Sequence, residues 1–433
     1  MDTPFFPAFR ASLAGFGRRV ERIRQATLSQ LEQFFGPFFP PQLLSQADEG
    51  PNSRERIFTV RRTFWGFLFQ VLTPHTSCRE VTLQLRALFG LHGDREVRTA
   101  SSAYCLARKR LPVERMEEAL LRSAQKADQL SSCNGRLAGR PVKVVDATSV
   151  QLPDTAENQR RYPQPRGQKP GCGFPVMKMA ALFSLASGAI VAVARESLHW
   201  HDVRLFRRLW SALRKGDIVL GDRAFADYVS LAQLPDQGVD LVCRLHQARK
   251  VDFRRCERRL GNRDAIFRWM KPPNRPGYLT RSQFARIPSS IAVRVLRTKI
   301  ERPGFRTQTI MLVTTLLDAG IYPAKELGAL YLRRWRLELC FRDLKTTMGM
   351  EQLRCQSPAM VDKESLAFLI AHNLIRCVMA DAGGVHGVEL ERISFKGSVD
   401  AVRRFSEALA QARNRKQRRR LEDQLLAVLA HDL

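Results

Sequence analysis

Three carboxylates in this chain of 433 residues have surroundings that suggest joint chemistry. Asp146 lies inside the apolar run KVVDATSV, Asp222 follows the run DIVLG, and Glu338 lies in the stretch YLRRWRLELCFRDLK. A carboxylate buried in a strand is costly unless it meets a cation or a metal ion. Three converging carboxylates would need positive charge, which Mg²⁺ supplies because hard cations prefer oxygen ligands. Two such ions about 4 Å apart promote in-line attack at a phosphodiester.

The stretch around Glu338 predicts a helix with one polar stripe. At about 100° per residue, five polar residues fall within a narrow arc: Tyr331, Arg334, Glu338, Arg342 and Lys345. Most apolar residues fall elsewhere on the helix: Leu332, Leu337, Cys340 and Leu344. We expect the helix to dock by its apolar face and to present the stripe, whose cations could bind phosphates. The alternative is an exposed helix with i,i+4 salt bridges, and Asp222 could likewise be a helix cap or turn residue.

The segments that carry the two aspartates predict an α/β sheet. Residues 141–152 and 217–223 are expected to form strands, and 177–185 with 189–197 a hairpin. Helices are expected at 201–215 and 225–234, and a further strand at 239–245. Strands that alternate with helices in this way are typical of α/β layers. A hydroxyl at Thr148 would share the face of Asp146, because side chains two apart on a strand point the same way.

Residues 246–320 predict a β-rich insertion that does not continue this pattern. Eleven basic residues against three acidic ones lie between Arg244 and Arg275, which indicates one basic face. A solvated charged surface is the ordinary alternative. From Pro323 the sequence predicts helices again.

The two ends of the chain predict helices. The segment 99–112 (TASSAYCLARKRLP) and the preceding 79–90 could form a helix-turn-helix-like pair that reads DNA. The basic residues that end the first segment could instead simply complement a helix dipole. We therefore predict three regions: an all-α domain at 1–140, a catalytic domain at 141–385 with the insertion at about 246–320, and a basic helical region at 386–433.

The charge of the chain indicates nucleic acid as the partner. Lys and Arg number 71 against 42 Asp and Glu, giving a net charge of +29 and an isoelectric point near 10.7. The longest uncharged run, between Lys178 and Arg195, is too short for a membrane span. Nine cysteines without a C-x-x-C pair favour reduced thiols in a cytoplasmic protein and argue against a zinc site.

The order of the three carboxylates resembles that of the DDE transposases of bacterial insertion sequences, specifically the insertion sequence 4 family. The signature of that family, Y-(2)-R-(3)-E-(6)-K, is matched without deviation by Tyr331, Arg334, Glu338 and Lys345. The interval from Asp222 to Glu338 is longer than that from Asp146 to Asp222, and this longer second gap matches the β-strand insertion of the family. The resemblance spans residues from about 80 to 380.

The resemblance implies an RNase H-like catalytic domain and a triad of Asp146, Asp222 and Glu338. It implies two Mg²⁺ ions, which Mn²⁺ can replace, and cut-and-paste transposition in which a freed 3′-OH joins target DNA. The implied partners are the ends of the element, the target duplex and a second copy of the chain on DNA, in the nucleoid of a bacterial cytoplasm.

The resemblance also implies roles for residues around the triad. Arg334 and Lys345 would hold phosphates near the cleaved end, and Tyr331 would contact the terminal backbone. Trp269, in the predicted insertion, would hold a flipped base, with β-packing as the alternative. Arg223 and Arg342 are further candidate phosphate ligands. Two other functions share these residues: a Mg²⁺-dependent nuclease without strand transfer, and a DNA-binding protein that has lost catalysis.

Overall fold

The computed structural model describes residues 31–32, 35–45, 56–73, 76–91, 100–131, 135–300, 308–412 and 414–431. The chain divides into two compact units. The helical unit comprises Met1–Lys126, Thr347–Gly349 and Ala359–Leu433, and the sheet unit comprises Ala127–Thr346 and Met350–Pro358. This division differs from the three predicted regions, because the C-terminal helices group with those of the N-terminal part.

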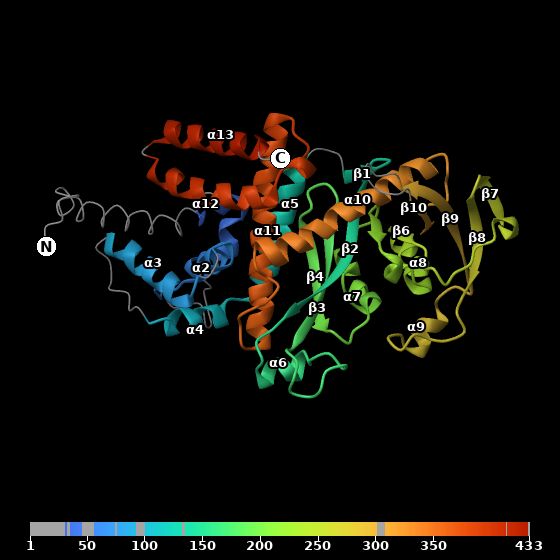
Figure 1. Cartoon of the computed structure of the whole chain (residues 1–433), viewed down its shortest axis with the longest axis horizontal. Helices are drawn as coiled ribbons and strands as arrows, with labels where there is room; N and C mark the ends of the chain where they lie inside the picture. The colour runs from blue at the N-terminus through green and yellow to red at the C-terminus, as the bar shows by residue number, and fades with distance from the viewer. Residues whose placement is uncertain are drawn as a thin grey trace, which may run out of the picture. The chain divides into compact units, whose positions relative to one another are not determined.

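One mixed β-sheet forms the centre of the sheet unit (Figure 1). Its strands are β1 (Arg136–Leu137), β2 (Arg140–Gln151), β3 (Val176–Ser184), β4 (Ile190–Ser197), β5 (Ile218–Gly221), β6 (Asp240–Arg244), β7 (Arg258–Gly261), β8 (Asp264–Met270), β9 (Ser290–Ile300) and β10 (Gln308–Thr314). Their order is β4-β3-β2-β5-β6-β10-β9-β8-β7, with β1 beside the start of β2. β2, β5 and β6 run parallel, and every other pair is antiparallel.

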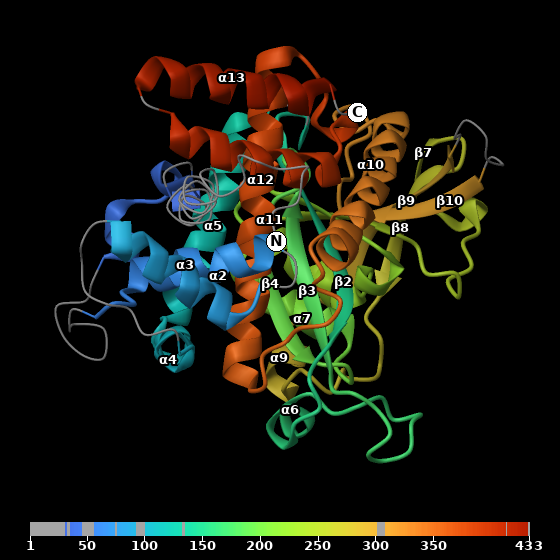
Figure 2. The same ribbon diagram turned by 60° about the vertical axis from the view of Figure 1, so that its left-hand side comes forward.

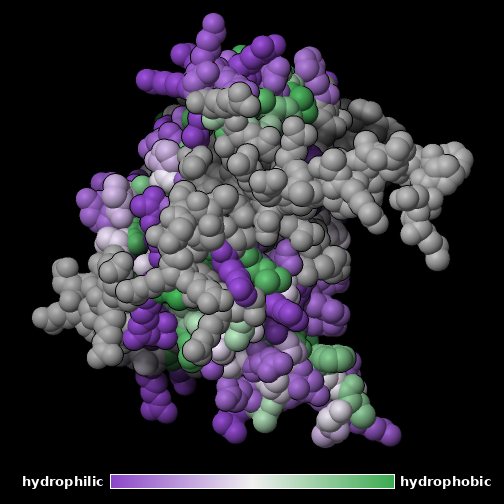
Figure 3. All heavy atoms as spheres, turned by 90° about the vertical axis from the view of Figure 1, so that its left-hand side faces the viewer, coloured by the Kyte–Doolittle hydropathy of each residue, from purple (hydrophilic) through white to green (hydrophobic). Residues whose placement is uncertain are grey.

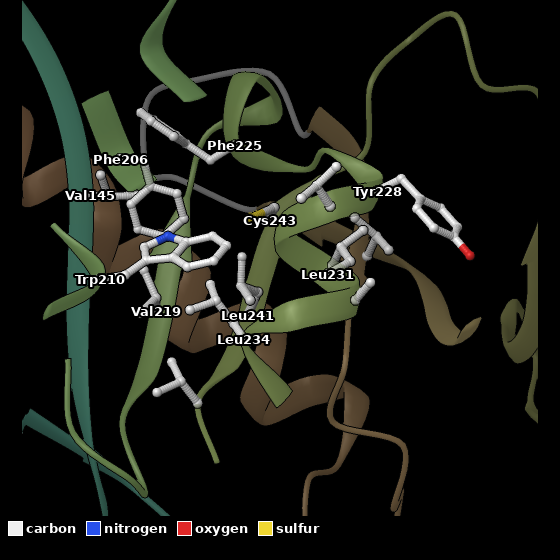
Figure 4. Close-up of a cluster of buried hydrophobic side chains, with 14 of the residues drawn as sticks. Val145, Phe206, Trp210, Val219, Phe225, Tyr228, Leu231, Leu234, Leu241 and Cys243 are labelled. Carbon is white, nitrogen blue, oxygen red and sulfur yellow. The ribbon is translucent and has the colours of Figure 1, made fainter. Parts of the chain in front are cut away.

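The parallel centre is short and apolar because both of its faces are covered. One face packs against α7 (Asp202–Arg208) and α8 (Tyr228–Gln233), and Figure 4 shows Phe206, Trp210 and Phe225 gathered there against Val145 and Val219. The other face packs against α10 (Ala324–Arg342), which contacts β2, β5, β6 and β9. The predicted α/β layers are therefore present, with a helix on each side of the strands that carry the aspartates.

The segment 246–320 is rich in strands, as the sequence predicts, and these strands belong to the same sheet. It contains β7 to β10 and the short helix α9 (Arg281–Ala285), and β10 pairs antiparallel with β6. The segment extends the sheet for a physical reason. β6 would otherwise expose a row of unpaired backbone groups, and β10 satisfies them by extending the same sheet.

A buried ion pair joins two strands of this extension. The Arg294 guanidinium is fully buried and binds both carboxylate oxygens of Asp264, at 2.8 and 2.6 Å. It also donates to the Tyr322 carbonyl oxygen at 2.7 Å. A bidentate pair with its remaining donors satisfied is the geometry in which burial of two charges is tolerated.

We expect Arg294→Met to destabilise the protein by about 3–5 kcal/mol, because it leaves the Asp264 carboxylate buried without its cation. Urea unfolding of the two proteins would measure the difference. The double variant Arg294→Met with Asp264→Leu is the control and should recover most of the loss. An equal loss in the single and double variants would contradict the explanation.

The helical unit is held together by side chains of its longest helix, α11 (Pro358–His386). Buried Lys363 donates to the Lys109 carbonyl oxygen at 2.6 Å, at the end of α4 (Ser102–Arg110). Buried Asn373 donates to the Leu120 carbonyl oxygen at 3.2 Å, in α5 (Val113–Leu130). The remaining long helices are α2 (Val60–Leu72), α3 (Cys78–Leu91), α12 (Phe395–Gln411) and α13 (Arg415–His431).

α11 is the one helix in the described part of the chain that is long and apolar enough to cross a membrane. Its apolar window is 89% buried inside the structure. This burial is typical of a core helix.

The predicted helix-turn-helix pair corresponds to α3 and α4, although residues 92–99 between them lie outside the described residues. Arg108, one of the basic residues at the end of α4, packs against two aromatic rings. Its guanidinium lies 4.9 Å from the ring centre of Phe67 and 5.3 Å from that of Tyr104. Lys109, by contrast, is exposed. That this helix pair binds DNA stays a prediction. Because Arg108 packs on the two rings, it is not among the residues that we expect to contact bases.

His372, in the middle of α11, gives the helical unit a pH-dependent stability. The imidazole is fully buried and stacks on Phe395 with 5.1 Å between ring centres. Burial, aided by nearby Arg376, lowers the pKa of His372 to about 3 from a usual value of 6.5. The folded state therefore holds this group neutral at pH values where the unfolded chain protonates it.

We expect this histidine to reduce the free energy of unfolding as the pH falls from about 6.5 towards about 3, by up to about 1.4 kcal/mol per pH unit. In His372→Leu that contribution should be absent. The measurement is the difference in free energy of unfolding between the two proteins at pH 7.5, 5.5 and 4.5. A difference that does not change with pH would contradict the assignment.

Candidate active site

Asp146 lies on β2, and Asp222 directly follows β5, the neighbouring parallel strand. β2 pairs with β5 such that Val142 lies opposite Ile218 and Val144 opposite Leu220. Two residues further along each strand come Asp146 and Asp222, so the same register, continued, brings them to one level. Asp222 still has extended dihedral angles, φ −71° and ψ 174°. Register-matched side chains on strands about 4.8 Å apart point to the same face.

That face is the one covered by α10. Val145 points into the core cluster beneath α7 and α8, so its neighbour Asp146 points the opposite way. Phe341 of α10 contacts Phe183 of β3 with 5.0 Å between ring centres. Phe183 is paired with Val144, which shares the face of Asp146. Both aspartates are half-buried, and the Asp222 side chain does not cap the turn that follows it. Asp222 is therefore a turn residue through its backbone, whose carbonyl oxygen accepts from the Phe225 N–H at 3.0 Å, while its carboxylate makes no capping bond.

The polar stripe of α10 begins against the sheet, not in solvent. Tyr331 is 3% exposed and Arg334 is 6% exposed, with the guanidinium 5.5 Å from the tyrosine ring centre. Burial raises the pKa of the Tyr331 hydroxyl far above its usual range; Arg334 nearby opposes this shift, and Cys243 and Asp222 add to it. The expectation that the stripe faces away from the docking side was wrong for these two residues. Helical periodicity groups residues on one face but does not say which face is buried.

The backbone of Glu338 lies between two residues of α10 whose side-chain contacts are described, Arg334 and Phe341. One helical turn earlier, Arg334 lies close to Tyr331. Three residues later, Phe341 packs over β3 on the face of Asp146. The side chain of Glu338 lies outside the described residues, as do those of residues 335–337. The helix thus carries Glu338 across the strands that hold the two aspartates.

Beyond α10 the helix changes its winding. Residues Asp343–Thr347 form a π-helical turn, which places Lys345 at a different angle from the one that regular periodicity predicts. Lys345 is half-buried, and Arg342, the last residue of α10, is exposed. Such single π-helical turns are common at functional sites. Both cations lie at the end of the helix that carries Glu338.

The protein family now follows from comparison with known proteins. A family model described as "Transposase DDE domain" matches residues 137–374, more than half of the chain. The chain belongs to the DDE transposase family. This result confirms the resemblance noted from the signature residues, and the protein is a DNA transposase of the insertion sequence 4 type.

The transposase is similar to a curated relative, and it aligns weakly with a solved structure. "Transposase InsG for insertion sequence element IS4" of Escherichia coli (strain K12) is 24% identical over 376 residues, covering 86% of this chain and 82% of the relative. A solved structure, the piggyBac transposase synaptic complex with hairpin DNA, aligns with a TM-score of 0.42 and 9% identity over 95% of this chain and 83% of that chain. That structural likeness is too weak to bear on the fold.

Arg223 and Thr148 lie beside the aspartates of the transposase, whereas Trp269 does not. Arg223 is exposed and donates to the Gln247 side chain at 3.1 Å, and Thr148 is half-buried on β2. Trp269, on β8, is only 9% exposed within the hydrophobic core cluster, and the Arg249 guanidinium lies 3.9 Å from its ring centre. This burial favours the packing alternative over a platform for a flipped base.

Asp227 is a residue near the site that the sequence analysis missed. It caps α8, accepting from the backbone N–H groups of Val229 and Ser230 at 3.0 and 3.2 Å, and it also accepts from the Tyr278 hydroxyl at 3.3 Å. Burial raises the pKa of its carboxyl group. Asp227 thereby fastens the turn after Asp222 to the segment of Tyr278. Its position directly before the helix YVSLAQ is the signal that could have revealed it.

The donor set around the aspartates fits a hard divalent cation. Asp146 and Asp222 offer two carboxylates at one level of the sheet, and oxygen ligands are those that Mg²⁺ prefers. Among the described side chains, no group of three or more His, Cys, Asp or Glu residues is placed to hold a metal ion. The third carboxylate of the triad, Glu338, lies outside that set.

Proposed function

We propose that Asp146, Asp222 and Glu338 are the catalytic triad of this transposase. The observation that carries the proposal is the register of β2 and β5, whose continuation by two residues brings Asp146 and Asp222 to one level, on the face covered by the helix of Glu338. The strand order β4-β3-β2-β5-β6, antiparallel in its first part and parallel in its second, supports an RNase H-like sheet. The proposed reaction is cleavage at the ends of the element and joining of the 3′-OH to target DNA.

The three carboxylates would hold two Mg²⁺ ions, or Mn²⁺ in their place. Bound there, these ions supply Lewis acidity and lower the pKa of an attacking water. The contribution of the chain is to hold the carboxylates in a fixed geometry. Asp146 and Asp222 have little freedom because their backbones belong to or directly follow paired strands. The cation of Arg334, buried beside Tyr331, lies where it can offset the negative charge that gathers at such a site.

The proposed substrate is double-stranded DNA, bound mainly through its phosphates. Lys345, Arg342 and Arg223 are the cations that would hold phosphates near the cleaved bond, because they are at least partly exposed and lie next to Asp222 in the chain or at the end of the helix of Glu338. A net charge of +29 supports additional contacts with the element ends and the target, and a second copy of the chain would bring two ends together.

A further basic surface lies on α13 of the helical unit. Five of its first six residues are basic: Arg415, Lys416, Arg418, Arg419 and Arg420. Figure 3 shows hydrophilic side chains gathered where Figure 1 places α13. Cations at the start of a helix oppose its dipole, so the arrangement favours a role in binding DNA phosphates rather than in helix stability.

The test uses purified protein, Mg²⁺ and a labelled duplex carrying the ends of the element, with Glu338→Gln alongside. We expect nicked, hairpin and joined products with the unmodified protein and none with the variant. Cleavage without joining would instead support the nuclease without strand transfer. Binding without cleavage by either protein would contradict catalysis in this chain.

A further inference from the structure

The loop that joins β2 to β3 is built around one glutamine. We define it as residues 163–175, after the short helix α6 (Ala156–Arg161). The Gln164 side-chain oxygen accepts from the backbone N–H groups of Gly171 and Gly173, at 3.1 and 3.2 Å. Its amide nitrogen donates to the carbonyl oxygens of Gln168 and Lys169, at 3.1 and 2.7 Å. One side chain thus ties the two sides of the loop together.

Further contacts determine the conformation of the β2–β3 loop. The Gln159 side chain, on α6, donates to the Gly173 carbonyl oxygen at 2.9 Å and accepts from the Gln164 N–H at 3.2 Å. Gly171 has a φ of +80°, which favours glycine, and a Cβ at Gly173 would collide with the Gln168 side-chain amide. The side chains of Gln159 and Gln164 together therefore hold the loop in this conformation.

This ordered loop exposes an aromatic side chain. Phe174 is 58% exposed, and no other aromatic residue among the described side chains belongs to the exposed class. Single exposed apolar residues are common on proteins, but a phenylalanine held out on a hydrogen-bonded frame has a fixed position from which to contact a partner. Arg166 and Lys169 are exposed on the same loop, and no acidic residue occurs between Glu157 and Glu196.

The loop lies beyond the carboxyl end of β2. Asp222 likewise follows the carboxyl end of β5, the parallel strand beside β2. Figure 2 shows it projecting from the foot of the sheet unit after α6. β2 continues for five residues from Asp146 to Gln151, which is roughly 17 Å at about 3.3 Å per residue. On a duplex that runs along β2, at about 3.4 Å per base pair, the loop is roughly five base pairs from a phosphate bound at the aspartates.

We propose that the β2–β3 loop contacts the duplex on which this transposase acts, with Phe174 packed against or between base pairs and with Arg166 and Lys169 on phosphates. This inference rests on the proposed function. Apolar side chains that enter a base step act as wedges that kink DNA, and adjacent cations position the backbone. Trp269 was expected to supply an aromatic contact with a base, but its ring is buried.

The exposed thiol of Cys172, two residues from Phe174, allows the contact to be mapped. An iron chelate attached to Cys172 in an Asp146→Asn background would generate hydroxyl radicals beside intact DNA carrying an element end. We expect strand cuts over a short stretch centred roughly five base pairs from the cleavage position. The same labelling of a Cys172→Ser variant should remove these cuts. Absence of cuts, or the same cuts from both proteins, would overturn the proposal.

The contribution of the ring is tested by affinity. We expect Phe174→Ser to weaken binding of the element end by roughly 5- to 150-fold, the range for loss of an aromatic contact with a base, and Phe174→Trp to retain binding. Ile321→Ser is the matched control, because Ile321 is 55% exposed in the same unit. Equal effects of the two serine variants would overturn the role of Phe174.

These experiments separate the loop from the catalytic proposal, because neither readout requires cleavage. Arg166→Gln and Lys169→Gln should each reduce the salt dependence of binding by about one unit of slope, as expected for a lost phosphate contact. An unchanged slope would remove the cations from the proposal. If the unmodified protein cleaves DNA and the loop variants bind the element end with unchanged affinity and salt dependence, the proposed function stands and the loop contact is refuted.

Discussion

Asp146→Asn and Asp222→Asn should each reduce DNA cleavage by roughly 1,000-fold or more. The register of β2 and β5, continued by two residues, brings the two carboxylates to one level, and the proposed chemistry needs both to stabilise charge worth several kcal/mol in the transition state. Binding of the element end should persist, because the amide variants keep the shape of the site and the basic surfaces remain. Single-turnover cleavage of a labelled end, with binding measured in Ca²⁺, checks both expectations.

The matched control for these variants is Glu257→Gln, which removes the same charge from an exposed position. Glu257 pairs with exposed Arg268 at 2.7 Å and lies on the extension of the sheet. Cleavage by this variant should match that of the unmodified protein. Loss of DNA binding in parallel with cleavage in the aspartate variants would point instead to a structural role for Asp146 and Asp222.

Arg334→Lys should lower the rate of cleavage by about 100-fold while the charge at position 334 is kept. Arg334 is buried beside Tyr331, where a planar guanidinium has a fixed orientation that a lysine ammonium cannot reproduce. Removal of one oriented donor from an active site typically reduces the rate by about 100- to 1,000-fold. The same single-turnover assay, together with the melting temperature, measures the effect.

A purely structural role for Arg334 would lower the melting temperature without changing the cleavage rate of the folded fraction. Lys325→Arg is the control on the same helix, because Lys325 is exposed at the first turn of α10. It should leave both the rate and the melting temperature unchanged. An Arg334→Lys variant that cleaves at the rate of the unmodified protein would contradict a role in catalysis.

The tertiary structure gives the spacing of the aspartates a physical meaning. The interval between Asp146 and Asp222 in the sequence is only a distance along the chain, but it equals the register offset between β2 and β5, which sets Val144 opposite Leu220. The pairing of strands so far apart depends on packing of the whole sheet. The residue types and their order could be recognised beforehand, whereas their alignment could not.

The sequence by itself determined the elements and the family. Apolar runs bounded by turn residues predicted β2 to β6, because local hydrophobic pattern and chain reversal are properties of neighbouring residues. The signature from Tyr331 to Lys345 identified the transposase family before any comparison. Net charge also indicated a nucleic acid partner, because calculating the charge requires only a count of residues and no structure.

Only the tertiary structure decided which side of each element is covered. It buried Tyr331, Arg334 and Trp269, although their residue types suggested exposed contacts with DNA. It paired β10 with β6. It also left Phe174 exposed on a loop, although the hydrophobicity of phenylalanine alone would predict a buried side chain. Periodicity defines the residues that share a face, but burial depends on which other element packs against that face, and those partners lie far apart in the sequence.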